Sequence, residues 1–220
     1  MPAPRIALIH AMPMAIEPVT QVFHELWPSA RITHLLDDSL PADLTAAGGI
    51  TAAIVDRFVA LARYCEGCGA DAILFTCSAF GSAIEAAKRA VRVPVLKPNE
   101  AMLDEALAEG GDVALLVTFE PSIPSLKKEL EELASSRGIR LQLKTRTVPA
   151  AIAALKQGRT EEHDQLIVTA AVELGRCDAL MLGQFSMARA ASGIPPVSGR
   201  RVLTSPHSAV ARLKQLFADR

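Results

Sequence analysis

The feature that most constrains this chain is an internal repeat with a fixed spacing of 107 residues. One ungapped shift aligns three strand-like segments with three others farther along the chain. The aligned segments are residues 6–9 with 113–116, 71–74 with 178–181, and 95–96 with 202–203. Chance rarely produces three matches at one offset. We therefore expect two similar lobes, residues 1–105 and 106–220.

The hydropathy pattern predicts an α/β fold in both lobes. Apolar runs of strand length alternate with longer stretches of helical spacing, and several runs are continuous, which is typical of parallel strands covered on both faces. Each lobe should form a mostly parallel sheet flanked by helices. The expected strands are residues 6–10, 32–36, 72–76, 93–96, 113–118, 141–147, 179–182 and 202–203. The expected helices are residues 15–27, 50–66, 80–91, 99–109, 122–137, 160–175, 185–192 and 206–218.

Ligands of open α/β sheets bind outside the carboxyl ends of the strands. No linker rich in Gly, Ser or Pro separates the two lobes. We therefore expect the pseudo-symmetric lobes to pack closely, with an active-site cleft between them. Equivalent residues of the repeat would then face each other across a small substrate.

The composition argues against several kinds of partner. Of 220 residues, 50% are hydrophobic, and the net charge is −1, so no overall field attracts nucleic acid. Aromatic residues make up 4%, too few for a surface that stacks bases. No run of about 18 apolar residues occurs, so we expect no membrane span and, by default, a cytoplasmic location.

Four cysteines raise the question of metal or redox chemistry. Cys65 and Cys68 form a CxxC pair, but no second pair of ligands accompanies it, as a zinc site would require. The pair also lies at the end of an expected helix. We interpret these two residues as structural and expect no bound metal.

Cys77 is the strongest candidate for chemistry. It follows the third expected strand, in the sequence Phe-Thr-Cys-Ser, and leads into a helix. Oriented N–H groups at a helix N-terminus lower the pKa of a thiol, and together with the Ser78 hydroxyl they can hold a carboxylate or an oxyanion. The alternative is a small cysteine buried at a strand end.

The repeat places Gln184 at the position equivalent to Cys77. The second lobe therefore keeps the strand and the turn but lacks the thiol. Gln184 can donate and accept hydrogen bonds but cannot act as a base. Phe185 and Ser186 follow it as candidate substrate contacts, although Gln184 is equally well explained as a capping or surface residue.

Other strand ends supply further candidates for the substrate site. The first strands of the two lobes end near His10 and near Thr118 and Glu120, and the last strand leads to His207. Thr118 is a candidate to bind a carboxylate. His10, Glu120 and His207 are candidates for proton transfer. Alternatively, His10 is a histidine buried at a strand end, Glu120 is a charge at a helix terminus, and His207 is a surface group.

At this point the chain resembles the aspartate/glutamate/hydantoin racemase superfamily. The resemblance rests on the two lobes and on the strand ends at residues 71–78 (DAILFTCS) and 178–183 (DALMLG), with the 93–96 segment (VPVL) between them. It implies an active site between the lobes, a small carboxylate or amino-acid-derived substrate, no cofactor or metal, and assembly as a homodimer. In two-base members, one thiol removes the α-proton and a second thiol returns a proton to the opposite face.

Cys77 matches the first of these thiols, but Gln184 stands where the second belongs. Cys177 does not replace it, because it precedes its strand. Three hypotheses stay open. The first is a racemase or epimerase whose second base is His10, Glu120 or His207. The second is a decarboxylase of substituted malonates that protonates an enolate with one thiol. The third is a protein that only binds a small carboxylate.

Overall fold

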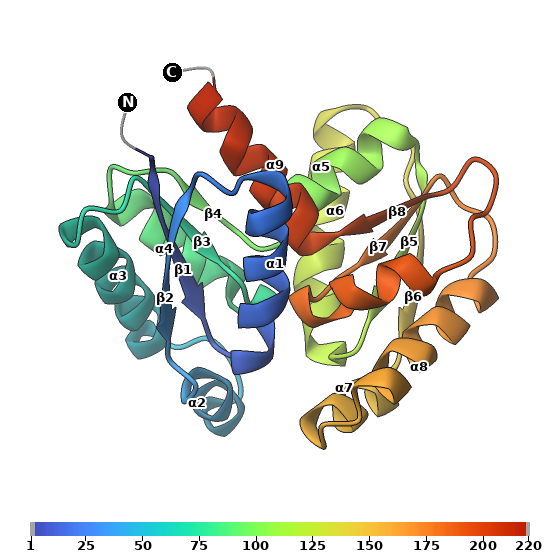
Figure 1. Ribbon diagram of the computed structural model, residues 1–220, viewed down its shortest axis with the longest axis horizontal. Helices are drawn as coiled ribbons and strands as arrows, with labels where there is room; N and C mark the ends of the chain where they lie inside the picture. The colour runs from blue at the N-terminus through green and yellow to red at the C-terminus, as the bar shows by residue number, and fades with distance from the viewer. Residues whose placement is uncertain (1–2, 219–220) are drawn as a thin grey trace. The chain divides into compact units, whose positions relative to one another are not determined.

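The first half of the chain builds a four-stranded parallel sheet (Figure 1). We describe the protein from a computed structural model, which describes residues 3–218. The spatial order of the strands is β2-β1-β3-β4. Their bounds are β1 (Arg5–His10), β2 (Arg31–Leu36), β3 (Ala72–Phe75) and β4 (Val95–Leu96). The two central strands, β1 and β3, are almost entirely buried, as their continuous apolar sequences predict.

The second half repeats this topology in the order β6-β5-β7-β8, again with all strands parallel. The bounds are β5 (Asp112–Val117), β6 (Gln142–Thr147), β7 (Ala179–Leu182) and β8 (Arg201–Thr204). The predicted fold class, two parallel sheets flanked by helices, is confirmed.

The repeat is visible at the level of individual hydrogen bonds. Ile6 pairs with Ala72 between β1 and β3, and Val113 pairs with Ala179 between β5 and β7, each 107 positions later. A carboxylate before the third strand accepts a bond from the first strand in both sheets. The two bonds are Arg5 N–H to Asp71 Oδ2 (2.7 Å) and Asp112 N–H to Asp178 Oδ2 (2.9 Å).

Helices cover both faces of the first sheet. One face packs apolar residues such as Ile9 and Phe75 against α3 and α4, and α1 lies on the other side (Figure 1). The helices of this half are α1 (Ile16–Leu26), α2 (Leu40–Ala47), α3 (Ala52–Gly67) and α4 (Gly81–Ala90). Short 3₁₀ turns, η1 (Pro13–Ala15) and η2 (Ser78–Phe80), precede α1 and α4.

The second sheet is covered in the same way. Val113, Leu115 and Val117 pack with α5 and α6, whereas Ala114 and Leu116 pack with α7, α8 and η4. This alternation is what parallel strands with helices on both faces require. The elements are α5 (Glu100–Glu109), η3 (Glu120–Ser122), α6 (Ile123–Ser136), α7 (Pro149–Lys156), α8 (Thr160–Glu173) and η4 (Phe185–Gly193).

The compact units of the structure have other boundaries than the predicted lobes, both in the middle of the chain and near its C-terminal end. The first unit comprises the described residues up to Pro98 and those from Ala209 onward, and the second comprises 99–208. Helix α9 (Ser205–Ala218) therefore begins in the second unit and continues in the first. There Lys214 Nζ donates to the carbonyl of Leu26 at 2.7 Å, and Phe217 contacts Trp27 with ring centroids 5.6 Å apart.

Two short helices and one 3₁₀ segment differ from the sequence-based expectation. Helices α2 and α7 lie in segments that we expected to be irregular, and both have proline in the first turn. Proline is favoured there because its missing N–H would lack a helical partner anyway. The stretch expected as a helix over 185–192 forms the 3₁₀ segment η4 instead.

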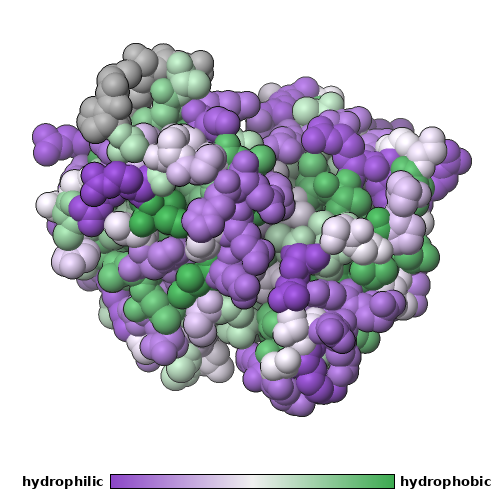
Figure 2. Space-filling model, in the orientation of Figure 1, coloured by the Kyte–Doolittle hydropathy of each residue, from purple (hydrophilic) through white to green (hydrophobic). Residues whose placement is uncertain are grey.

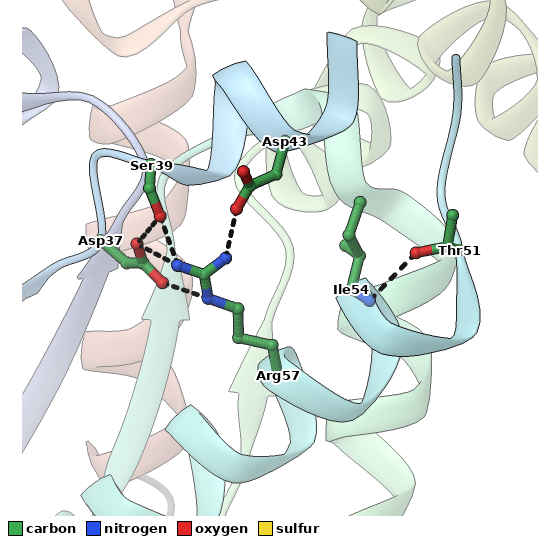
Figure 3. A network of polar contacts seen from close by, with 6 residues as sticks. All are labelled: Asp37, Ser39, Asp43, Thr51, Ile54 and Arg57. Atoms are coloured by element: carbon green, nitrogen blue, oxygen red, sulfur yellow. Dashed lines mark hydrogen bonds and ion pairs between the residues drawn. The ribbon is translucent and has the colours of Figure 1, made fainter. Parts of the chain in front are cut away.

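A charged network holds α2 against α3 in the first unit (Figure 3). Arg57 of α3 makes ion pairs of 2.6 Å with Asp37, which follows β2, and with Asp43 of α2, and it also donates to Ser39. The α3 helix begins nearby, where the side chain of Thr51 accepts the N–H of Ile54. Because the guanidinium has several donors in a fixed plane, it can bind all three partners at once.

The surface drawn in Figure 2 carries both hydrophilic and hydrophobic side chains. On the face drawn in Figure 2, hydrophilic residues are interspersed with smaller hydrophobic groups. Among the described residues, no helix has the combination of length and apolar sequence needed to cross a membrane.

Candidate active site at the carboxyl ends of the strands

Cys77 lies at the carboxyl end of the first sheet, two residues after the last residue of β3. Its backbone is extended (φ −120°, ψ 121°), and it precedes η2, which runs directly into α4. The side chain is partly buried on the face of the sheet that α3 and α4 cover. The strand thus delivers the thiol to the edge of the sheet where α/β proteins bind their ligands.

The environment of Cys77 raises the pKa of its thiol. Burial is the larger influence because it disfavours the thiolate, whereas a hydrogen bond from the backbone of Ala79 acts in the opposite direction. The expectation that the helix N-terminus would lower this pKa is therefore wrong, since desolvation outweighs the backbone donors. At neutral pH the group is a protonated thiol, suited to giving a proton.

Gln184 occupies the equivalent position in the second unit, and both ends of its amide make hydrogen bonds. Its Oε1 accepts from the backbone N–H of Thr118 at 2.7 Å and from the Thr118 hydroxyl at 3.3 Å. Its Nε2 donates to Ser122 Oγ at 3.0 Å, and that hydroxyl donates to the carbonyl of Phe119. The amide therefore ties the end of β7 to the turn after β5, and both of its ends have partners.

The residues that precede Cys77 and Gln184 also differ between the repeats. Thr76 in the first unit bonds to His10 on the neighbouring strand. The corresponding pair in the second unit is Gly183 and Val117, where a Cβ at Gly183 would lie 2.8 Å from Val117 Cγ1. Polar contact in one unit is thus replaced by close apolar packing in the other.

His10 is completely buried, and both of its ring nitrogens are occupied. Its Nδ1 lies 2.9 Å from Thr76 Oγ1, and its Nε2 lies 3.0 Å from His34 Nδ1. Burial, with a smaller contribution from His34, lowers the pKa of His10 to about 4. His10 is therefore a neutral imidazole at physiological pH, with no ring nitrogen left to contact a substrate.

The remaining predicted site residues fall into an accessible and a buried group. Ser78 is partly buried and Glu120 is exposed, so both are accessible at the strand ends. Phe185 and Ser186 are buried, at 2% and 5% exposure. His207 is partly buried, with its Nδ1 2.7 Å from the hydroxyl of Thr204. Direct contact with a substrate stays a prediction for all of them.

Three polar residues with buried or paired side chains escaped sequence reasoning. His34 bonds to His10, Ser122 bonds to Gln184, and His163 is fully buried with its Nδ1 2.8 Å from Asp164 Oδ1. A histidine on the apolar face of α8, which Ile167 continues, was the one available signal for His163. The partner of His34 depends on strand register and that of Ser122 on the paths of two turns, neither of which the sequence reveals.

The cysteines outside the candidate site have no partner sulfur. Cys65 is buried, Cys68 is exposed, and both are free thiols. Burial raises the pKa of Cys65 to about 11. Within residues 3–218, no three His, Cys, Asp or Glu side chains are grouped in a way that would hold a metal ion.

Comparison with known proteins agrees with this architecture. Residues 23–213 match the family model described as Asp/Glu/Hydantoin racemase. A search of curated proteins gave no match.

Among solved structures, a glutamate racemase from Bacillus anthracis has 16% identity and a TM-score of 0.73, over 100% of this chain and 83% of that one. An aspartate racemase from Picrophilus torridus has 15% identity and a TM-score of 0.71, over 98% and 95%. An arylmalonate decarboxylase has 19% identity and a TM-score of 0.63, over 96% and 92%. At these identities the structures show a shared fold. Because the family model spans most of the sequence, the chain belongs to the Asp/Glu/hydantoin racemase family.

Proposed function

We propose that this protein is an enzyme that transfers a proton at the carbon atom next to a carboxylate, with Cys77 as the group that carries the proton. The observation that supports this most is the placement of the thiol of Cys77, a partly buried residue, at the carboxyl end of a central strand. The family and its structural neighbours, named as racemases and a decarboxylase, support an enzyme of this general kind.

The substrate carboxylate needs hydrogen-bond donors when it becomes an enediolate. We assign this role to the Ser78 hydroxyl and to backbone N–H groups at the start of η2 and α4, beside the thiol. Donors of this kind are worth about 3 kcal/mol each when they meet developing charge in a site shielded from water. No metal or organic cofactor enters this proposal.

Racemisation needs proton transfer on two faces of the reacting carbon. A base takes the proton, its C–H electron pair becomes part of the enediolate, and an acid returns a proton to the opposite face. Gln184 cannot serve as the second group, because its amide neither titrates nor has a free end. Of the bases predicted for a racemase, Glu120 is exposed, whereas His10 is enclosed in the sheet.

Decarboxylation is the second candidate, and the Cys77–Gln184 difference favours it mechanistically. In this reaction the bond between the reacting carbon and one carboxylate breaks, and its electron pair stays on the carbon as an enediolate. Carbon dioxide leaves, the thiol gives its proton to the carbon, and the thiolate regains a proton from water. One protonated thiol is sufficient for this sequence, and the raised pKa of Cys77 suits it.

The experiment is to assay Cys77→Ala and Cys77→Ser on a panel of amino acids, hydantoins and substituted malonates. We expect turnover by the parent protein to fall by at least about 10³-fold in both variants, because the proton carrier is gone. Cys68→Ser is the matched control, since this exposed cysteine lies on the opposite end of the strands, and it should retain activity. Full activity in Cys77→Ala would refute the proposal.

A further inference from the structure

Packing in the first unit accounts for Cys65 of the CxxC pair but not for Cys68. Cys65 is 5% exposed and belongs to the same apolar cluster as Phe58 and Ile73. Cys68 is exposed at the C-cap of α3 and does not belong to that cluster. Free cysteines are among the most often buried residues, and their conservation or use is decided by reactivity when packing does not explain them. The exposed member of the pair therefore points to chemistry.

The helical backbone places the two cysteine side chains next to each other. Helix α3 runs to Gly67, and the N–H of Cys68 still bonds to the carbonyl of Tyr64 at 2.9 Å, so the pair is three positions apart in helical geometry. Side chains at this spacing lie on one face, with Cβ atoms about 5–6 Å apart. Burial, and after it the nearby Cys68, raise the pKa of Cys65 to about 11, which is consistent with a close pair.

The surroundings of Cys68 are those of a reactive thiol. The Arg5 guanidinium lies beside it, with Nη1 donating to the Cys68 carbonyl at 2.6 Å. The Tyr64 hydroxyl makes a hydrogen bond with the side chain of Cys68, and this contact is the main cause of the raised pKa of Tyr64. Reactive cysteines are found in electropositive, accessible places of this kind. Cys68 thus has the exposure and the neighbours of a nucleophile, with a second thiol one helical turn away.

From these observations we infer that Cys65 and Cys68 form a redox-active dithiol, a modification site that small-molecule disulfides convert reversibly to an internal disulfide. Cys68 is the attacking thiol because it is exposed, and Cys65 completes the exchange from its buried position next to it. The site lies at the end of α3 that leads into the start of β3, whereas Cys77 follows the end of that strand. The inference is therefore independent of the proposed function.

The exchange consists of two steps. The Cys68 thiolate attacks one sulfur of the small disulfide, the S–S bond breaks, and one thiolate leaves. The sulfur of Cys65 then attacks Cys68 in this mixed disulfide and releases the second thiolate. The two cysteines lose two electrons and two protons, and the small disulfide gains both as two thiols. Cys65 is mostly protonated at neutral pH, but its step is intramolecular, and proximity strongly favours such steps.

Forming the disulfide must tighten the last turn of α3. A disulfide needs Cβ atoms about 3.5–4.5 Å apart, closer than the helical spacing provides. The turn is held by the N–H of Ala70, which bonds to the Cys65 carbonyl at 3.1 Å, and by the contact of Arg5 with the Cys68 carbonyl. Strained or exposed disulfides are the readily reduced ones. We therefore expect an excess of reduced glutathione to restore both thiols.

The test incubates the reduced protein with glutathione disulfide at pH 7, stops the reaction with acid, and alkylates the remaining thiols after unfolding. Chymotrypsin cleaves after aromatic residues, so it separates residues 65–75, which contain both cysteines of the pair, from Cys77. Mass spectrometry should find residues 65–75 unlabelled and lacking two hydrogens. This oxidation should be at least about tenfold faster than any modification of Cys77 or Cys177, because those thiols are shielded by burial.

Two matched variants separate the roles of the cysteines. Cys65→Ala, which keeps a small apolar side chain in the core, should stop at the mixed disulfide between Cys68 and glutathione. Cys68→Ser should leave Cys65 a free thiol over the same time. A mixed disulfide that persists in the parent protein would overturn the inference, as would equally fast oxidation of Cys65 in Cys68→Ser. A disulfide that excess reduced glutathione fails to open would likewise contradict a reversible site.

Discussion

At the scale of single residues, the repeat places a thiol and an amide in equivalent positions with different surroundings. Cys77 has one hydrogen bond, from the backbone of Ala79, and remains partly accessible. Gln184 has partners at both ends of its amide and links the ends of two strands. The first position therefore suits chemistry, and the second stabilises the edge of its sheet.

Replacing Gln184 should destabilise the second unit. In Gln184→Ala, the N–H of Thr118, a residue that is 1% exposed, loses its acceptor. An unpaired buried donor costs about 1–3 kcal/mol of unfolding free energy, which urea denaturation will measure. Gln184→Glu keeps an oxygen acceptor for Thr118 and should lose clearly less stability. Equal losses in the two variants would show that the Thr118 bond does not matter.

The reactivity of the cysteines should differ with pH. Because burial raises the pKa of Cys77, its thiolate is scarce at pH 7, and its alkylation should accelerate about tenfold per pH unit below that pKa. Exposed Cys68 should be alkylated first at pH 7, and Cys65, with a pKa of about 11, last. Mass spectrometry of peptides after iodoacetamide treatment at pH 7 and pH 9 measures this order. Faster labelling of Cys77 than of Cys68 at pH 7 would indicate a thiolate and contradict the acid role.

At the scale of secondary-structure elements, a histidine pair joins β1 to the edge strand β2. Buried His10 bonds to exposed His34, and their rings stack with centroids 5.2 Å apart. Beyond them, Thr76 directly follows β3, and Thr20 of α1 lies 3.5 Å from the other nitrogen of His34. The chain of polar contacts thus spans three strands and one helix of the first unit.

This pair should make the protein sensitive to acid. The folded state holds His10 at a pKa of about 4, below its ordinary value of 6.5, so the unfolded state binds more protons between these values. The contribution of His10 to the free energy of unfolding is therefore fully present above about pH 6.5. It falls by about 3 kcal/mol as the pH drops toward 4. Urea denaturation between pH 7 and pH 4 measures the loss.

His10→Val tests the origin of that loss, since valine is the equivalent residue, Val117, in the second unit. The variant should lose less stability than the parent protein over the same pH interval. His24→Gln, which removes an exposed histidine of α1, should behave like the parent protein. An unchanged pH dependence in His10→Val would show that other groups cause the acid sensitivity.

Helix α2 depends on a small number of anchors. Its Leu40 is buried, most of its other residues are exposed or partly exposed, and Arg57 binds Asp37 and Asp43 on either side of its start (Figure 3). Arg57→Met should therefore accelerate amide hydrogen exchange in residues 40–49 several-fold. Because the ion pairs are partly exposed, global stability should fall by only about 1 kcal/mol. Asp38→Asn, which alters an exposed neighbouring acid, should not change the exchange of α2.

Sequence reasoning located the strands well and the short helices poorly. The buried strands have continuous apolar runs, which no other element of this length shares so clearly. Helices α2 and α7 have eight residues each and carry proline in the first turn, so their sequences look like turns. The contact between His10 and His34 was beyond prediction, because it depends on the pairing of Leu8 with His34 in the register of two parallel strands.

At the scale of the whole molecule, the repeat predicted two similar parallel sheets and placed Cys77 at a strand end. The same spacing of 107 residues relates the strands, their hydrogen bonds and the Cys77–Gln184 pair. The raised pKa of Cys77 and the engaged amide of Gln184 were not predictable, because both depend on how side chains are buried and paired in three dimensions. The sequence identified the two equivalent positions, whereas the structure distinguished their surroundings.

The most direct test of a single proton-carrying thiol is the product formed in heavy water. The parent protein should convert its best substrate to a product with one deuterium on the reacting carbon, and Cys77→Ser should form it at least about 10³-fold more slowly. Decarboxylation should give a product of one handedness, whereas racemisation should give both. Equal deuterium incorporation by the parent protein and Cys77→Ser would contradict the proposal that Cys77 carries the proton.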